Sequence, residues 1–209
     1  MEIYWLGHGC FRLKGREATV LTDPAPPSTG YKIGKVAADV VTVSRDVPES
    51  NYREAVQGEP KFVTSPGEYE IAGVMLSGIA TRKLSDERGR NVAYVIEIDD
   101  IRICHLGDIQ QVPTGDEGEQ LSSPDVLLLP VGGPPVLNAE KAAEIVSLLE
   151  PKIVIPMLYK TEASAAQFEP VDRFLKEMGL EPKPPESRLN VTKSTVPSDT
   201  TVVLLNYRG

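Results

Sequence analysis

The sequence predicts a fold of the α/β or α+β class, in which two β-sheets pack face to face and helices lie outside them. Two observations indicate this. The first half of the chain consists of short apolar segments, typical of strands, that are separated by glycine-containing turns. The second half alternates strand-like segments with segments of helical periodicity. These patterns by themselves do not distinguish α/β from α+β.

Short strands follow one another in the first half. The first of them carry the apolar residues Ile3, Trp5, Phe11, Leu13, Val20 and Leu21. Residues 24–34 include three prolines and two glycines, which predicts a loop. Apolar residues 40–43 predict a buried strand, and the alternation over 61–79, interrupted by glycines, predicts hairpins. Two further strands, at 91–98 and 101–105, flank a tight turn at Asp99-Asp100.

Two helices are predicted in the second half. Apolar residues recur with the helical period over 142–149, with Asn138 as the N-cap and Pro151 just beyond the end. The same period over 171–178 predicts a second helix, which has a proline in its first turn and a glycine as its stop. The strands around these helices are expected at 126–129, 153–157 and 201–206. The first of these is an apolar run, as expected for a strand that is covered on both faces.

Composition limits the classes of function. The 209 residues include 22 Lys and Arg and 30 Asp and Glu, which gives a formal net charge of −8. Nucleic acids and anionic membranes both require a basic face, so neither is an expected partner. No apolar run approaches the roughly 18 residues of a membrane span, and no secretory signal is recognised. We expect a single domain over residues 1–209 in the cytoplasm. Two cysteines, Cys10 and Cys104, do not make a disulfide framework.

Five short motifs occur in a characteristic order. They are WLGHGCF at 5–11, VLTDP at 20–24, HLGD at 105–108, LLLPVGG at 127–133 and IPMLYKT at 155–161. In this order and spacing the chain resembles the metallo-β-lactamase superfamily, closest to its metal-dependent hydrolase-like branch, which includes a lactonase. The resemblance covers nearly the whole chain. It implies a four-layer αββα sandwich and, in intact members, one or two zinc ions held by an HxHxDH loop and by further His and Asp residues.

The metal-ligand positions of that family are mostly substituted in this chain. The positions that correspond to ligands are Arg45, Val47, Glu49, Ser50, Lys83, Asp108 and Leu158. The aspartate that bridges two metals is kept as Asp108, and Glu49 is a conservative change. Arginine has no lone pair for a metal, and valine has no donor atom. We therefore expect no metal and no other cofactor here, although intact relatives use zinc.

Two of these positions have become cationic while Asp108 remains. A half-buried aspartate in an empty zinc site would be an unpaired anion, which is energetically costly. We hypothesise that Arg45 or Lys83, or both, form a salt-bridged cluster with Asp108, and that Asp46 or Glu49 adds to it. The alternative is that all of these are ordinary solvated charges on loops.

Other candidate residues have structural as well as functional interpretations. His8 is either a remnant of substrate positioning or a turn histidine bound to the backbone. The resemblance implies that Asp23 steadies the ligand loop by hydrogen bonds, and His105 is expected to be a structural residue at a strand end. The predicted ligand pocket consists of His8, Asp23, Arg45, Asp46, Lys83, His105, Asp108, Leu158 and Tyr159.

Three functions follow from these residues. The first is a non-catalytic homologue that binds an unknown small molecule or protein. The alternative is an active hydrolase of an ester, lactone or phosphodiester, with an atypical metal site around Asp108, Glu49 and His8, which are the catalytic candidates. The third is a structural or oligomerisation role. Because homo-oligomers are common in the family, self-association is also an expectation.

Overall fold

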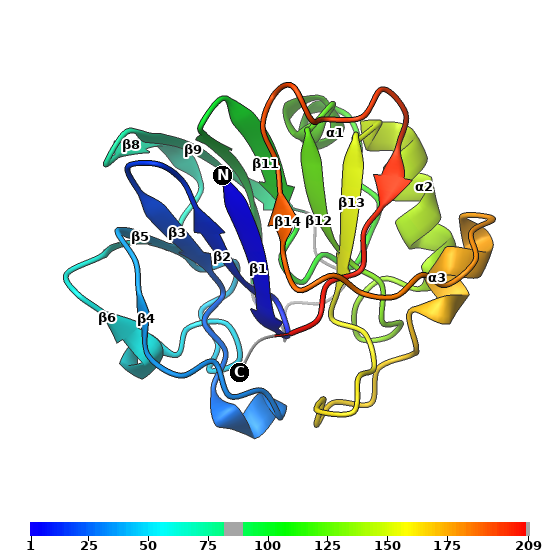
Figure 1. Cartoon of the computed structure of the whole chain (residues 1–209), viewed down its shortest axis with the longest axis horizontal. Coiled ribbons are helices and arrows are strands. Elements are labelled where there is room, and N and C mark those ends of the chain that lie inside the picture. Colours follow the sequence, from blue (N-terminus) through cyan, green and yellow to red (C-terminus); the bar gives the residue numbers. More distant parts are fainter. Residues whose placement is uncertain (82–89, 208–209) are drawn as a thin grey trace.

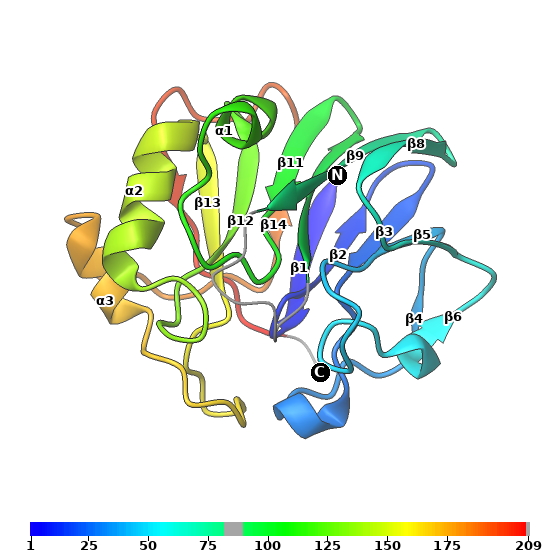
Figure 2. The same cartoon turned by 180° about the vertical axis from the view of Figure 1, so that it is seen from behind.

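The computed structural model describes residues 1–81 and 90–207. Two β-sheets pack face to face, and the helices α2 and α3 lie along the outside of one of them (Figure 1). The same arrangement is visible from behind, where α1 lies at one end of that sheet (Figure 2). This is the two-sheet arrangement that the sequence predicts.

The first sheet comes mainly from the N-terminal part of the chain. In spatial order its strands are β14 (Leu189–Asn190), β1 (Glu2–Gly7), β2 (Cys10–Lys14), β3 (Thr19–Thr22), β5 (Val40–Thr42) and β7 (Lys61–Val63). The neighbours β1, β2 and β3 are antiparallel, whereas β3, β5 and β7 run parallel. Because Thr22 pairs with Thr42, the residues that follow β3 and β5 lie side by side at one edge.

The second sheet combines a hairpin region with a parallel region. In spatial order its strands are β15 (Thr201–Val202), β13 (Ile153–Met157), β12 (Val126–Pro130), β11 (Ile101–His105), β10 (Asn91–Ile98), β9 (Val74–Thr81) and β8 (Gly67–Ile71). Strands β11, β12, β13 and β15 run parallel to one another, whereas β8, β9, β10 and β11 are joined by antiparallel pairs. The predicted turn between β10 and β11 is confirmed, since Asp99 and Asp100 both have positive φ, at 53° and 63°.

The helices bury one face each. The predicted helix with Asn138 as N-cap is α2 (Ala139–Leu149), and the Asn138 side chain accepts a hydrogen bond from the Lys141 backbone N–H at 3.0 Å. The second predicted helix is α3 (Asp172–Glu177), which is shorter than its pattern. The helix α1 (Asp116–Leu121) was not predicted, because its one buried residue gives no periodic signal. No helix in the described ranges has the length and apolar character of a membrane span.

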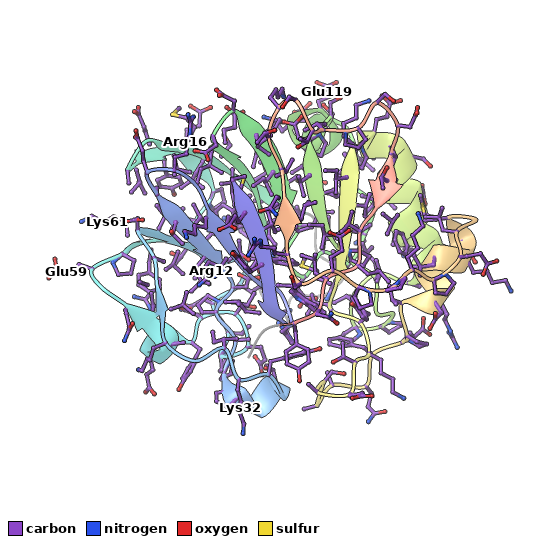
Figure 3. The ribbon with its side chains drawn as sticks, in the orientation of Figure 1. Arg12, Arg16, Lys32, Glu59, Lys61 and Glu119 are labelled. Atoms are coloured by element: carbon purple, nitrogen blue, oxygen red, sulfur yellow. The ribbon has the colours of Figure 1, made fainter. Side chains whose placement is uncertain are left out.

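The main core lies between the two sheets and under the helices. Its largest fully buried side chains include Trp5, Phe11 and Tyr94. The other face of the first sheet is covered by residues 23–39 and 43–60, which hold two short 3₁₀ helices and the paired strands β4 (Val36–Ala37) and β6 (Val56–Gln57). The outer layer on this side is thin. The charged side chains of Lys32 and Glu59 project from it to the periphery, as does Lys61 from β7 (Figure 3).

The C-terminal strand is shorter than predicted. The pattern over 201–206 predicts one strand, but β15 ends at Val202, and Leu205 instead forms an isolated bridge with Glu186. The chain leaves the edge of the sheet because β15 pairs with β13 over two residue pairs only. The segment from β14 to β15 thus joins the first sheet to the second.

Candidate functional site

A pocket of about 280 Å³ lies at the end of the sandwich where strands of both sheets finish. Its polar lining consists of His8, Asp23, Arg45, Glu49, Ser50 and Asp108. Its apolar wall consists of Pro135, Val136, Leu158, Ala166 and Phe168. His8 follows β1, Asp23 follows β3, Arg45 lies beyond β5, and Asp108 lies beyond β11. The topology therefore gathers segments that follow strand carboxyl ends, the usual place for a site in α/β sheets.

Asp23 fixes the segment that carries Arg45. Its Oδ1 accepts a hydrogen bond from the Ser44 backbone N–H at 2.6 Å, and its Oδ2 accepts one from the Ser44 hydroxyl at 2.5 Å. Asp23 is 3% exposed, and burial raises its pKa to about 7, although both bonds from Ser44 favour the charged form. These bonds are the steadying contacts that the sequence analysis assigned to Asp23.

Arg45 and Asp108 form an ion pair within the lining of the pocket. Arg45 Nη1 contacts Asp108 Oδ2, and the two side chains are 15% and 16% exposed. This is the pairing that the charge pattern predicts for Arg45. Lys83, the second predicted cation, lies outside the described residues.

The turn that carries Asp108 is held against Ser44. The Asp108 backbone N–H donates to Asn91 Oδ1 at 2.9 Å, and Asn91 Nδ2 donates to the Leu106 carbonyl at 3.0 Å. Gly107 has φ +59°, and a Cβ there would lie 2.4 Å from the Ser44 Cβ. Only glycine permits this approach, so the two segments that supply Arg45 and Asp108 are in direct contact.

The two histidines are neutral at pH 7. Burial lowers the pKa of His8 to about 4, against an opposing effect of the Glu49 carboxylate. Burial likewise lowers the pKa of His105 to about 4. His105 Nε2 lies 3.1 Å from the Gly9 carbonyl oxygen, which can only accept, so Nε2 carries the proton. His105 thus supports the pocket floor from below, while His8 lines the pocket itself.

Three residues of the predicted pocket lie elsewhere. Asp46 is exposed and accepts a hydrogen bond from Asn51 Nδ2 at 2.8 Å, because its loop turns its carboxylate toward its own chain. His105 is completely buried beneath Gly9. Tyr159 is buried against Trp5, with ring centroids 5.1 Å apart, and burial raises the pKa of its hydroxyl. These positions follow the family motifs in sequence, but their side chains point away from the pocket.

Most residues of the apolar wall carry no signal in the sequence. Phe168 has its ring centroid 6.0 Å from that of His8 and closes one side of the pocket. It belongs to a loop without periodicity that is shaped by long-range bonds, such as Lys160 N–H to the Glu169 carbonyl at 2.9 Å. No local sequence pattern marks such a residue, since its position depends on how the loop closes.

The donor groups of the pocket do not fit a metal ion. Within the described ranges no cluster of three or more His, Cys, Asp or Glu side chains is arranged to hold one. Both oxygens of Asp23 already accept hydrogen bonds from Ser44, and Asp108 faces a guanidinium. Zinc requires three or four converging nitrogen, sulfur or carboxylate donors, and this arrangement does not supply them.

Comparison with known proteins gives the family. The profile of the Beta-lactamase superfamily domain matches residues 2–158. A UPF0173 protein of Pyrococcus furiosus is 29% identical over 192 residues, which cover 79% of this chain and 86% of the relative. A UPF0173 metal-dependent hydrolase of Archaeoglobus fulgidus is 27% identical over 195 residues, which cover 77% and 84%.

Solved structures agree with this assignment. A crystal structure from Thermotoga maritima, described as a candidate Zn-dependent hydrolase of the metallo-β-lactamase superfamily, has 35% identity and a TM-score of 0.83. The superposition covers 98% of this chain and 97% of that one. An isothiocyanate hydrolase from Delia radicum gut bacteria shares the fold at a TM-score of 0.70 with 14% identity, over 92% of this chain and 99% of that one. The chain therefore belongs to the metallo-β-lactamase superfamily, has its sandwich fold, and has relatives that are named metal-dependent hydrolases.

Proposed function

We propose that this protein binds a small polar molecule in the pocket above the Arg45–Asp108 ion pair. The observation that carries the proposal is that ion pair, because it places a fixed cation and a fixed anion at the floor of an otherwise open site. Charged groups beside an apolar wall support binding as the first candidate. The pocket volume of about 280 Å³ suits a metabolite at the small end of the usual ligand range.

The two sides of the pocket have different roles in this proposal. The wall of Val136, Leu158 and Phe168 removes apolar ligand surface from water and limits ligand size. On the polar side, neutral His8 offers either a donor or an acceptor, and Glu49 offers an acceptor. A ligand with an apolar part and one or two hydrogen-bonding groups therefore matches the site.

A second candidate is hydrolysis of an ester, lactone or phosphodiester at an atypical site around Asp108, Glu49 and His8. The names of the relatives favour it, since the Archaeoglobus fulgidus relative is called a metal-dependent hydrolase. Two carboxylates and one neutral imidazole of this pocket would be the groups available to that reaction. Hydrolysis would require Arg45 to leave Asp108, because the ion pair occupies that carboxylate.

One experiment separates the two candidates. A panel of small carboxylates, lactones, esters and phosphodiesters is tested by isothermal titration for binding and by product analysis for turnover, with and without added Zn²⁺ or Mn²⁺. We expect saturable binding without turnover, weakened about tenfold or more by Phe168→Ala, which opens the apolar wall. The control Arg102→Gln removes a charge that pairs with Glu97 outside the pocket, and it should leave binding unchanged.

Other outcomes of the same panel decide against the first candidate. Metal-dependent turnover that is lost in Asp108→Asn would establish hydrolysis. Neither binding nor turnover across the panel, with the same behaviour in Phe168→Ala, would contradict both candidates and favour a role outside this pocket.

A further inference from the structure

We infer that the Arg45 guanidinium is the resident cation of this pocket: it neutralises Asp108 in place of a divalent metal, and the folded protein takes up no metal there. This inference concerns the same pocket as the proposed function, and it rests on that proposal only for the idea that the pocket binds a ligand. The names of the relatives would lead one to expect a bound metal, because they describe metal-dependent or Zn-dependent hydrolases. The inference is the opposite for this chain.

The cation is held by both sheets. Ser44, which precedes Arg45, is bound through its N–H and hydroxyl by Asp23 at the end of β3 in the first sheet. The Ser44 carbonyl accepts a hydrogen bond at 2.9 Å from the N–H of Val92, which lies in β10 of the second sheet. The backbone that leads into Arg45 is therefore fixed by contacts other than the ion pair, as expected for a preorganised site.

The segment that carries Asp108 is also held by contacts with its neighbours. The Asp108 N–H is bound by Asn91, and the contact of Gly107 with Ser44 brings the two segments together. The backbone segments that carry both partners are thus held by other contacts, so the pair can form without rearrangement of either segment. This distinguishes the pair from a chance encounter of two long surface side chains.

Burial also sets this pair apart. Among the side-chain ion pairs of the described residues, Arg45–Asp108 alone has both partners less than one fifth exposed. Arg102–Glu97, for comparison, is 33% and 52% exposed. A carboxylate as buried as Asp108 needs a cationic or hydrogen-bonding partner, because an uncompensated charge there is strongly destabilising.

A guanidinium and a divalent metal exclude one another at this place. Arg45 Nη1 contacts Asp108 Oδ2, and its cationic guanidinium has no lone pair to share with a metal. A divalent ion at the same carboxylate would lie within a few ångströms of that charge and be repelled by it. Of the other donors in the pocket lining, both Asp23 oxygens are engaged by Ser44. His8 and Glu49 then leave one imidazole and one carboxylate, fewer than the three or four donors that zinc requires.

The test is a double-mutant cycle combined with metal analysis, and no organic ligand is present in it. Thermal unfolding is followed for the wild type, Arg45→Gln, Asp108→Asn and the double variant, each with EDTA and with Zn²⁺ or Mn²⁺. We expect Arg45→Gln to lower Tm by roughly 6 °C or more, because it leaves Asp108 uncompensated. The double variant should recover about half of that loss or more, since neither charge remains. The wild-type Tm should be the same with EDTA and with metal.

The pair Arg102→Gln and Glu97→Gln is the matched control, and as an exposed ion pair it should show almost no coupling. If neither uncharged variant folds, Arg45→Lys, which keeps a cation, is analysed instead. A metal-free, folded Arg45→Lys protein supports the inference, and one that binds Zn²⁺ overturns it. Stoichiometric metal in the wild type that EDTA removes with a loss of Tm also overturns it, as does the absence of coupling in the cycle. Because these readouts need no ligand, failure to find a ligand for the pocket would leave this result intact.

Discussion

At the residue scale, the ionisable groups of the pocket are tuned mainly by burial. His8, Asp23 and His105 each have a pKa moved toward the neutral form, because desolvation outweighs the neighbouring charges. Arg45 and Asp108 form an ion pair in the lining of the same pocket.

The buried histidines predict a loss of stability in acid. Each has a folded-state pKa of about 4 against an ordinary value of 6.5, so between these values the unfolded chain binds protons that the folded chain does not. Their stabilising contribution is complete above about pH 6.5 and is lost as pH falls toward 4, at about 3 kcal/mol each. Asp23 acts in the opposite direction, because its raised pKa favours the folded state at lower pH.

Two histidines outweigh one aspartate, so urea unfolding should give a lower free energy at pH 4.5 than at pH 7. His105→Gln, which can still donate to the Gly9 carbonyl, should shrink that difference, and Asp23→Asn should enlarge it. An unchanged difference in His105→Gln would contradict the assignment to this histidine.

At the element scale, the site depends on how strands and turns end. The turn after β11 brings Asp108 to Ser44 only because Gly107 has no side chain. The helix α2 ends at Leu149, and its C-cap Glu150 is a non-glycine residue in the left-handed region at φ 50°. The turn after β11 has a glycine at its left-handed position, whereas the C-cap of α2 has a glutamate at its left-handed position.

Gly107→Ala should be strongly destabilising. The new Cβ would lie 2.4 Å from the Ser44 Cβ and 2.6 Å from Asn91 Oδ1, so both partners would have to move. We expect a loss of roughly 3 kcal/mol or more in chemical denaturation, from the clash added to the strained φ. Gly73→Ala is the matched control: it has φ +75° but no neighbour within 4 Å, so about 1 kcal/mol should be lost. Equal losses at the two positions would contradict the close approach.

Glu150→Gly should stabilise the protein. A glycine adopts the left-handed conformation at the C-cap without the steric cost that Glu150 carries, so a gain of about 1 kcal/mol is expected. The measurement is the free energy of unfolding in urea. Glu140→Gly, on an exposed position in the first turn of the same helix, should instead lose about 1 kcal/mol. A loss in both variants would show that the conformation of Glu150 is not strained.

At the scale of the whole molecule, the C-terminal segment ties the sheets together. β14 extends the first sheet beside β1, and β15 extends the second beside β13 (Figure 1). The segment also buries Val191 and Leu205, which are 1% and 2% exposed. It lies beyond residue 158, where the match to the family profile ends.

Removing the chain from residue 187 onward should lower the free energy of unfolding by several kcal/mol. Two large apolar side chains leave the core, at roughly 1.5–3 kcal/mol each, and the edges of β1 and β13 lose their partners. Thermal unfolding of the truncated chain checks this. Lys193→Gln removes only the ion pair of a 65% exposed lysine with Asp125 and should cost less than about 1 kcal/mol. A truncated chain as stable as the full one would show that the segment adds nothing.

The sequence alone determined the elements whose signals are local. The cap of α2 at Asn138 and the turn at Asp99-Asp100 were predicted because a few neighbouring residues fix each of them. The motifs also gave the family and the positions at which metal ligands are replaced. The sequence left Arg45 open between a solvated charge and a partner of Asp108.

Only the tertiary structure decided that Arg45 is the partner of Asp108. Arg45 lies beyond β5 of the first sheet and Asp108 beyond β11 of the second, and the two meet where these segments pack on each other. The same reason explains the other differences. Phe168 and Ala166 line the pocket through the closure of a loop, whereas Tyr159 turns inward to Trp5. Local patterns record which face of an element is apolar, but the contents of a pocket depend on which distant segments are brought together.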